Sequence, residues 1–275
     1  MIKKIIKVFL ILIIIVSLTF LYARYIATSG LKTNEIVINT SIDNDFDGLK
    51  IVHFSDLHYK RIITKDRIND IINEINLINP DIVVFTGDLI DQDSNITNKD
   101  IKYLKETLKK INAKYGKYSV IGNHDYSIDI EKIRDIYKES DFILLENNYD
   151  FIYSKNNQKI FIGGISTGEF NESVLSKLTN EENIYKIIIM HEPDYIDSIK
   201  GLKPNIVMAG HSHNGQINIP YIKNFFLPTN AKKYYDKYYK VDDIDLYVSN
   251  GIGVSRVNFR LFNTPSINFY RINKK

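Results

Sequence analysis

The chain opens with one long apolar run that is bounded by positive charges. Val8 to Ala23 include no charged residue, three lysines precede the run and Arg24 follows it. A helix over these sixteen residues is about 24 Å long, and one that starts at Ile5 is about 28 Å, close to the ~30 Å hydrocarbon core of a bilayer. The pattern predicts one transmembrane helix within an N-terminal membrane anchor at residues 1–27.

A cleaved signal peptide is the alternative for this segment. Signal peptides also have a basic start and a short apolar centre, and Ala27-Thr28-Ser29 offers small residues for cleavage. These residues lie beyond Arg24, which favours an anchor. Three lysines before the span and one arginine just after it favour an N-terminus in the cytoplasm. We therefore expect a single-pass protein of the cell membrane with an extracytoplasmic domain.

After a short tether at residues 28–33, strand-length apolar runs alternate with amphipathic segments. Apolar runs predict strands at 35–39, 49–54, 82–85, 118–121 and 142–145. Apolar residues with a helical period predict helices around 68–78, 101–111 and 130–137. Thr64 is the expected N-cap of the first helix. This order of strand, helix and strand is typical of a doubly wound α/β fold.

Beyond residue 150 the pattern changes to one with more strands. A hairpin is expected at 151–162, with a polar turn at 155–158. Further strands are expected at 187–190, 206–209, 216–219, 245–248 and 267–271. Two sheets packed face to face, with helices outside them, would bury all of these apolar positions. One domain at residues 34–275 is the simplest division of the chain.

Five short polar segments, each just after an apolar run, carry side chains that bind divalent metals. They are Ser55-Asp56-Leu57-His58, Gly87-Asp88-Leu89-Ile90-Asp91, Gly122-Asn123-His124-Asp125, Met190-His191-Glu192 and Gly210-His211-Ser212-His213. Five of the six histidines lie in these segments, and only His53 lies outside. Taken singly, each segment could be an ordinary strand end, turn or helix cap. Because ligand sites form where strand ends meet in α/β sheets, the set predicts one site.

The residue types limit the chemistry of this site. The chain has no cysteine, so thiolate ligands and thiol nucleophiles are excluded. Aspartate, histidine and asparagine donors suit Mn, Fe, Zn or Co better than Ca or Cu(I). Two such ions, partly neutralised by Asp56 and Asp88, would attract a phosphate and lower the pKa of a bridging water. The resulting hydroxide would attack a phosphoester in line with the departing oxygen.

The net charge bears on possible partners. The formal charge is +3, but the three lysines and Arg24 of the leader exceed that surplus, so residues 25–275 carry −1. A domain with this charge does not attract polyanions by net charge. No nucleic-acid polymer is therefore expected as a partner.

The five segments occur in the order found in the calcineurin-like metallophosphoesterase superfamily, which the chain resembles over residues 34–275. The apolar leader, the segment 210–216 and the segment 247–253 resemble more narrowly its bacterial transmembrane branch, which includes UDP-2,3-diacylglucosamine hydrolase-like phosphodiesterases. The resemblance implies a four-layer α/β/β/α sandwich of two mixed sheets with outer helices. This agrees with the two sheets expected from the apolar pattern.

The resemblance also implies residue roles in a site with two metal ions. One ion would be held by Asp56, His58 and His213, and the other by Asn123, His191 and His211. Asp88 would bridge the two ions. His124 would lie near the leaving-group oxygen, as a general acid or as a stabiliser of the transition state, and Asp91 would orient it.

The function expected is hydrolysis of a phosphodiester, phosphomonoester or pyrophosphate bond by a membrane-anchored enzyme. A lipid-linked substrate, including a nucleotide-sugar lipid such as UDP-2,3-diacylglucosamine, is one candidate, and envelope lipid or nucleotide esters are others. A non-catalytic scaffold with the same fold is an alternative, although such a protein would normally have lost ligands. A protein phosphatase is a second alternative.

Three residues outside the segments could be mistaken for functional ones. His53 lies in an apolar run, so we expect a buried sheet residue without a chemical role. Arg256 and Arg260 could pair with a phosphate, but surface arginines are common and neither is expected to do so.

Overall fold

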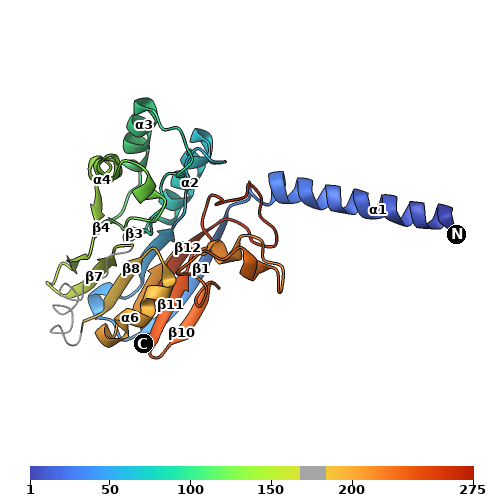
Figure 1. The fold of residues 1–275 in the computed structure, drawn as a ribbon. Helices are drawn as coiled ribbons and strands as arrows, with labels where there is room; N and C mark the ends of the chain where they lie inside the picture. Colours follow the sequence, from blue (N-terminus) through green and yellow to red (C-terminus); the bar gives the residue numbers. More distant parts are fainter. Residues whose placement is uncertain (168–183) are drawn as a thin grey trace.

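The computed structural model describes residues 1–167 and 184–275, which form two six-stranded sheets packed face to face (Figure 1). The first sheet consists of β1 (Lys32–Thr40), β12 (Ser266–Lys274), β2 (Leu49–Phe54), β3 (Ile82–Phe85), β4 (Gly116–Ser119) and β5 (Phe142–Leu144), in that order. Strands β2 to β5 are parallel, and β12 is antiparallel to β2. Since parallel and antiparallel pairs occur together, this is a mixed sheet.

The second sheet is built in the same way. It consists of β10 (Tyr238–Val241), β11 (Ile244–Val248), β9 (Ile206–Ala209), β8 (Lys186–Met190), β7 (Lys159–Ile165) and β6 (Asn148–Tyr153), in that order. Its four central strands are parallel, and both edge strands are antiparallel to their neighbours. The predicted hairpin at 151–162 is confirmed as β6 and β7.

Helices cover the outer faces of the sheets. The first sheet is covered by α2 (Lys65–Ile78), α3 (Asn98–Leu108) and α4 (Ile130–Glu139), and the second by α6 (Ile196–Ile199) (Figure 1). Side chains along β2 point alternately to the two faces of the sheet, so Phe54 packs beneath the helices and Ile51 packs between the sheets. In β8, Ile188 packs toward α6 and Ile187 packs between the sheets. The predicted α/β/β/α sandwich is confirmed.

Local sequence signals set several of the element ends. The Thr64 side chain accepts a hydrogen bond from the Arg67 N–H and caps α2 as predicted. Thr97 and Asp100 form a capping box at the start of α3. Helices α2 and α3 therefore each follow a residue whose side chain satisfies a backbone N–H group of the first turn.

The strand predicted at 216–219 is wrong. Gln216 has a left-handed φ of 43°, and its side-chain amide donates to the carbonyls of Val257 and Phe259. The segment makes only a single β-bridge, between Ile217 and Leu261. The alternation of apolar residues was misleading here because a buried polar side chain fixes the loop. The edge of the second sheet is formed instead by β10.

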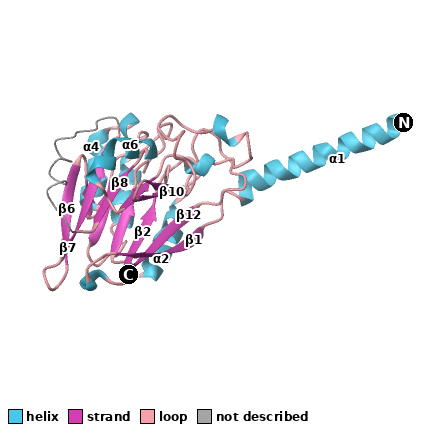
Figure 2. Cartoon of the chain, turned by 90° about the horizontal axis from the view of Figure 1, so that it is seen from below, coloured by secondary structure: helices cyan, strands magenta, loops and turns pink. Residues whose placement is uncertain are grey.

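The N-terminal helix α1 (Ile2–Leu21) continues into a π-helical turn (Tyr22–Ile26) and projects from the domain (Figure 2). No residue of α1 is buried, and its length and apolar composition are sufficient to cross a membrane. Its base is packed: the Arg260 N–H donates to the Ala23 carbonyl at 3.0 Å, and the Phe20 and Phe259 ring centroids are 5.9 Å apart. Residues 28–33 include the buried Thr28 and the first two residues of β1.

Candidate metal centre

The five polar segments meet where strands of both sheets end. They follow β2, β3 and β4 in the first sheet and β8 and β9 in the second. The His58 N–H donates to the Asp88 carbonyl at 3.1 Å, which joins two of the segments. Across the sheets, the His211 N–H lies 3.1 Å from each carboxylate oxygen of Asp56. The chain thus holds these segments together through its backbone.

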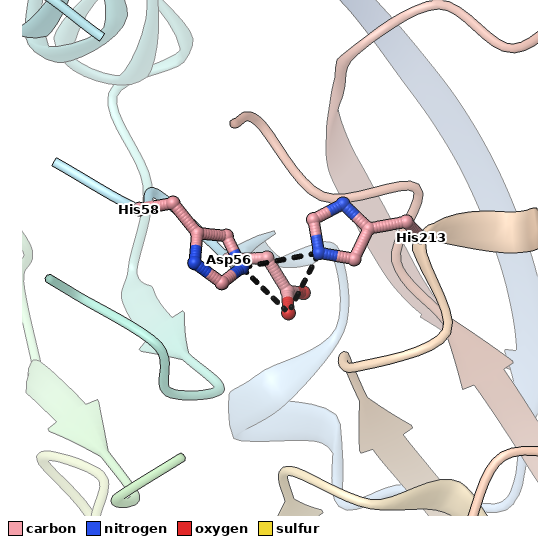
Figure 3. Close-up of side chains that lie close together, drawn as sticks. All are labelled: Asp56, His58 and His213. Atoms are coloured by element: carbon pink, nitrogen blue, oxygen red, sulfur yellow. Dashed lines mark hydrogen bonds and ion pairs between the residues drawn. The ribbon is translucent and has the colours of Figure 1, made fainter. Parts of the chain in front are cut away.

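Asp56, His58 and His213 direct their donor atoms at one point (Figure 3). The Nε2 atoms of His58 and His213 are 3.2 Å apart, and Asp56 Oδ1 lies 3.4 Å from His213 Nε2. Asp88 Oδ2 lies 3.6 Å from His58 Nε2, on the side of a second cluster. All of these side chains are buried.

The second cluster consists of Asp88, His191 and His211, with Asn123 beside them. His191 Nε2 lies 3.2 Å from Asp88 Oδ2, 3.1 Å from Asn123 Oδ1 and 3.1 Å from His211 Nδ1. Asp88 is therefore shared by both clusters. The structure brings together all seven residues that the sequence marks as metal ligands.

The donors fit divalent metal ions. An ion bound at about 2.0–2.2 Å from each donor requires donors about 3–4 Å apart, which is the spacing found in both clusters. Asp56 and Asp88 are fully buried, and within the described part of the chain no lysine or arginine forms an ion pair with either. Two buried carboxylates are costly unless positive charge compensates them. Bound metal would supply the missing positive charge.

Outer hydrogen bonds leave the correct nitrogen of two histidines free for a metal. His191 Nδ1 lies 2.6 Å from the Thr86 carbonyl, so Nδ1 carries the proton and Nε2 faces the cluster. His211 Nε2 lies 2.8 Å from the Thr229 carbonyl, so its Nδ1 faces the cluster. Such contacts fix the tautomer and orientation of ligating histidines.

The backbone of these segments is strained. Five residues that the sequence marks as ligands have left-handed φ values: Asp56 (53°), His58 (44°), Asp88 (58°), His211 (67°) and His213 (47°). Each such conformation costs on the order of 1–3 kcal/mol and persists only where the surroundings enforce it. At Gly122, a Cβ atom would lie 2.2 Å from Asp88 Oδ1, so only glycine permits this approach. The concentration of strain here is typical of a functional site.

Asp125 has a role in the site that the sequence alone does not establish. Its buried carboxylate accepts hydrogen bonds from the backbone N–H groups of Asp88, Leu89 and Gly122 at 2.9–3.0 Å. It therefore ties the Gly-Asp segment to the Gly-Asn-His segment. The one sign of this role in the sequence is that Asp125 directly follows His124.

His124 lies beside the two clusters. Its ring packs edge-on against His58 at 4.6 Å between centroids, and its Nε2 lies 3.5 Å from Ser255 Oγ. Asp91 Oδ1 lies 3.7 Å from His124 Nδ1, but also 3.4 Å from His58 Nδ1. Arg61 forms an ion pair with Asp91 at 3.2 Å. The Asp91 carboxylate therefore faces both histidines.

Arg260 is not the surface arginine that the sequence suggested. Its side chain is fully buried, and its guanidinium donates to the carbonyls of Asn250 (2.9 Å) and Gly251 (3.0 Å). It also lies 3.2 Å from His213 Nδ1. Burial lowers the pKa of Arg260 to about 9, so it stays charged at neutral pH. The neighbours of Arg260 in the sequence do not reveal this burial, because the carbonyls that enclose its guanidinium belong to residues 250–253.

Replacing Arg260 with methionine is expected to lower the free energy of unfolding by about 2–4 kcal/mol, because several buried carbonyls would lose their donor. Arg256→Met is the matched control: Arg256 is exposed on the same loop, and its loss should change stability by less than about 0.5 kcal/mol. Urea denaturation followed by circular dichroism measures both. Equal midpoints for the two variants would show that the buried contacts contribute nothing.

His53 is buried as predicted, between the sheets. Its Nε2 lies 2.9 Å from Thr86 Oγ1, and burial lowers its pKa to about 3. It is therefore a neutral structural residue.

Burial and charge set the protonation of the ligand histidines without metal. Burial lowers the pKa of His211 to about 3 and also lowers that of His213. Burial would lower the pKa of His191 as well, but the nearby Asp88 carboxylate outweighs it and raises that pKa to about 10. At neutral pH His191 alone of these three carries the extra proton.

Metal binding is therefore expected to release about one proton per chain near pH 7, since a ligating histidine must be neutral. The apparent metal affinity should rise roughly tenfold per pH unit while the pH is below the pKa of His191. Calorimetric titration of the metal-free protein with Mn²⁺, in two buffers that differ in ionisation enthalpy, counts the protons. A binding heat that is the same in both buffers would contradict the expectation.

A cavity of about 220 Å³ opens beside the clusters. It is lined by Asp88, Asn123, His124, Glu192, His211 and His213. Further lining residues are Phe226, Pro228 and Thr229 from the loop after β9, and Ser255, Arg256 and Val257 from the loop after β11. Members of both donor clusters thus line a pocket that has polar and apolar side chains.

Buried carboxylates and histidines at strand ends, strained loops and an adjoining pocket are found together here. The family model for calcineurin-like phosphoesterases matches residues 49–249. This chain belongs to the calcineurin-like phosphoesterase family. Members of the family bind divalent metals, and the chain is a metal-dependent phosphoester hydrolase.

Three relatives of this phosphoesterase illustrate its range. It is 30% identical over 257 residues to the uncharacterized metallophosphoesterase YkuE of Bacillus subtilis (strain 168), covering 91% of this chain and 88% of that protein. It is 24% identical over 222 residues to phosphodiesterase YaeI of Escherichia coli (strain K12), covering 79% and 80%. It is 25% identical over 243 residues to a transmembrane protein with metallophosphoesterase domain from Danio rerio, covering 82% and 53%. The apolar N-terminal helix suggests that this phosphoesterase is also anchored in a membrane.

Proposed function

We propose that this phosphoesterase uses two divalent ions to hydrolyse a phosphodiester, phosphomonoester or pyrophosphate bond at a membrane. The observation that carries the proposal is the position of Asp88. Its Oδ2 lies 3.6 Å from His58 Nε2 in one cluster and 3.2 Å from His191 Nε2 in the other. A carboxylate shared between two donor clusters suits a bridging ligand.

In this arrangement Asp56, His58 and His213 hold one ion, and Asn123, His191 and His211 hold the other. When bound, the ions supply a nucleophile by lowering the pKa of a water molecule and offset the charge of the phosphate. Mn, Fe, Zn and Co are all compatible with these donors.

The chain's own residues bind and position the substrate around these ligands. His124 lines the cavity and carries a ring nitrogen with a proton for the departing oxygen. Asp91, held by Arg61, lies close enough to orient the His124 ring. Phe226 and Val257 add apolar side chains to the lining of the same cavity.

The anchor and the similarity to phosphodiesterase YaeI favour a diester of a membrane-associated molecule. In this proposal residues 1–27 anchor the enzyme, residues 28–33 connect the anchor, and residues 34–275 carry the site. The lysines before α1 and Arg24 after it favour a domain outside the cytoplasm. A reporter fused to Lys275 that is active only inside the cell would overturn this orientation.

The test is metal analysis of the full chain in detergent together with hydrolysis of p-nitrophenyl phosphate and bis(p-nitrophenyl) phosphate. About two ions per chain and turnover of at least one ester are expected. Full metal content without turnover of any phosphoester would favour a scaffold. Faster dephosphorylation of phosphopeptides than of small diesters would favour a protein phosphatase. A chain that binds no metal would contradict the proposal at its first step.

A further inference from the structure

Two loops beside the base of α1 carry apolar side chains that face solvent. The loop after β9 exposes 93% of Tyr221, 45% of Ile222 and 83% of Phe225. The loop before β12 exposes 72% of Phe262. These four side chains form one group, the apolar rim.

Exposed apolar side chains are concentrated in this rim. Among the described residues outside α1 and its π-helical turn, three of the four most exposed large apolar side chains belong to it. The fourth, Leu77, lies near the end of α2, close to the start of β3 and so at the edge opposite the metal ligands. Single exposed apolar residues are ordinary, but a group on one side indicates an interaction surface.

The two loops of the rim are bonded to each other, and the second of them contacts the base of α1. The Asn218 N–H donates to the Leu261 carbonyl at 2.8 Å, which ties one loop to the other. The second loop contacts α1 through the Phe20 and Phe259 rings and through the bond from the Arg260 N–H to Ala23. Both loops, orange and dark red in Figure 1, lie on the side of the domain from which α1 leaves.

The packed base of α1 restricts how the domain can tilt. Ala23, Ala27 and Thr28 are buried against the domain, so α1 is not joined through a free linker. If α1 spans a bilayer, its C-terminal end lies at the membrane surface, where Arg24 meets the headgroups. Since one loop of the apolar rim contacts this end and the other loop is bonded to the first, the rim then lies near the same depth.

The rim also adjoins the mouth of the cavity beside the metal clusters. Phe225 precedes Phe226, a residue of the cavity wall. On the other loop, Val257 lines the cavity and lies two residues before Phe259, which contacts α1. Two residues of extended chain span at most about 7 Å. The cavity wall and the membrane surface are therefore neighbours.

We propose that the apolar rim inserts into the headgroup region of the membrane that α1 spans, and that the cavity receives the phosphoester of a molecule resident in that membrane. Aromatic side chains favour this interfacial zone. Because α1 holds the domain at a bilayer, the headgroup region of that bilayer can cover the rim side chains. The choice of substrate rests on the proposed function, whereas the docking of the rim does not. The substrate class is an amphiphile with a phosphoester headgroup.

The docking is tested with single tryptophans, because the chain has none of its own. Full-length Phe225→Trp, Phe262→Trp and the control Leu77→Trp are placed in lipid nanodiscs that hold one chain each. Lipids with brominated acyl chains should quench the two rim tryptophans and leave Leu77→Trp unquenched. The proposal would be overturned if bromolipid quenched none of the three tryptophans. It would also be overturned if the emission of the rim tryptophans shifted to shorter wavelength without quenching, because this would indicate contact with protein and not with lipid.

The substrate class is tested with two chromogenic diesters that share one reacting group. p-Nitrophenyl hexadecyl phosphate is placed in the nanodisc, and p-nitrophenyl methyl phosphate is dissolved in water. In each, water adds to phosphorus, p-nitrophenolate leaves and a proton is released. With Mn²⁺ present, the double variant Phe225→Asp, Phe262→Asp should lose about tenfold on the long-chain ester and keep its rate on the short-chain ester within about twofold.

An equal loss on both esters would show that the rim acts on the fold of the site and would overturn the substrate class. If the unmodified chain cleaves neither ester while bromolipid still quenches the rim tryptophans, the proposed hydrolysis fails and the docking stands. The two readouts therefore separate the membrane surface from the chemistry.

Discussion

Asp88→Asn is expected to lower phosphoester hydrolysis by about 1,000-fold or more and to remove at least one metal ion per chain. Asparagine keeps the shape of the side chain and an oxygen for the His124 N–H, which bonds to Asp88 Oδ1 at 2.8 Å. It loses the negative charge that both donor clusters share. Metal analysis and hydrolysis of bis(p-nitrophenyl) phosphate, performed on the same preparation, measure the two effects.

Asp93→Asn is the control for this change. Asp93 lies on the same segment, but its side chain is 72% exposed and forms only a 3.6 Å ion pair with Arg61. Such surface pairs contribute little, so its metal content and activity should match those of the unmodified chain. If the Asp88→Asn variant keeps both its metal and its activity, Asp88 is not a metal ligand of this site.

His124→Ala is expected to lower kcat by about 10²–10⁴-fold while both ions stay bound. The reason is that His124 lines the cavity but belongs to neither of the two ligand clusters that meet at Asp88. If it protonates the departing oxygen, the loss should be larger for phenyl esters, which have a poor leaving group, than for p-nitrophenyl esters. A series of aryl phosphodiesters with different leaving-group pKa values measures this dependence.

The pH profile gives a second readout of the same variant. Burial lowers the pKa of His124 below 6.5, although Asp88 and Asp91 oppose that shift. Since the protonated form would be the active one, the rate should fall as pH rises through this pKa, and His124→Ala should lack that limb. A loss that is the same for every leaving group, with an unchanged pH profile, would reduce His124 to a structural role.

Regular elements could be predicted because each has a local cause. The period of Ile68, Ile71, Ile72 and Ile75, with Thr64 as cap, determines α2, and all four isoleucines are buried in the structure. Apolar runs likewise marked β2 and β3 at their observed ends. The ligand segments follow such runs, so their common position at strand ends could also be foreseen.

The connections of the site could not be predicted in this way, because their causes lie far apart in the sequence. Gln216 resembles part of a strand until its bonds to Val257 and Phe259 are known. Arg260 resembles a surface residue until the carbonyls of residues 250–253 enclose it. Asp125 could be seen next to His124, but its hydrogen bonds reach the segment after β3. Contacts of this kind depend on the assembled fold.

The packed base of α1 also bears on proteolytic processing. The small residues that a leader peptidase would need, Ala27 and Thr28, are both buried against the domain. Peptidases bind their substrates as extended, accessible chain, which this joint does not offer. Cleavage here would have to take place before the domain folds. A chain that folds before it is cleaved would keep its helix, and with it the hydrogen bond from the N–H of Arg260, whose side chain contacts His213, to the Ala23 carbonyl.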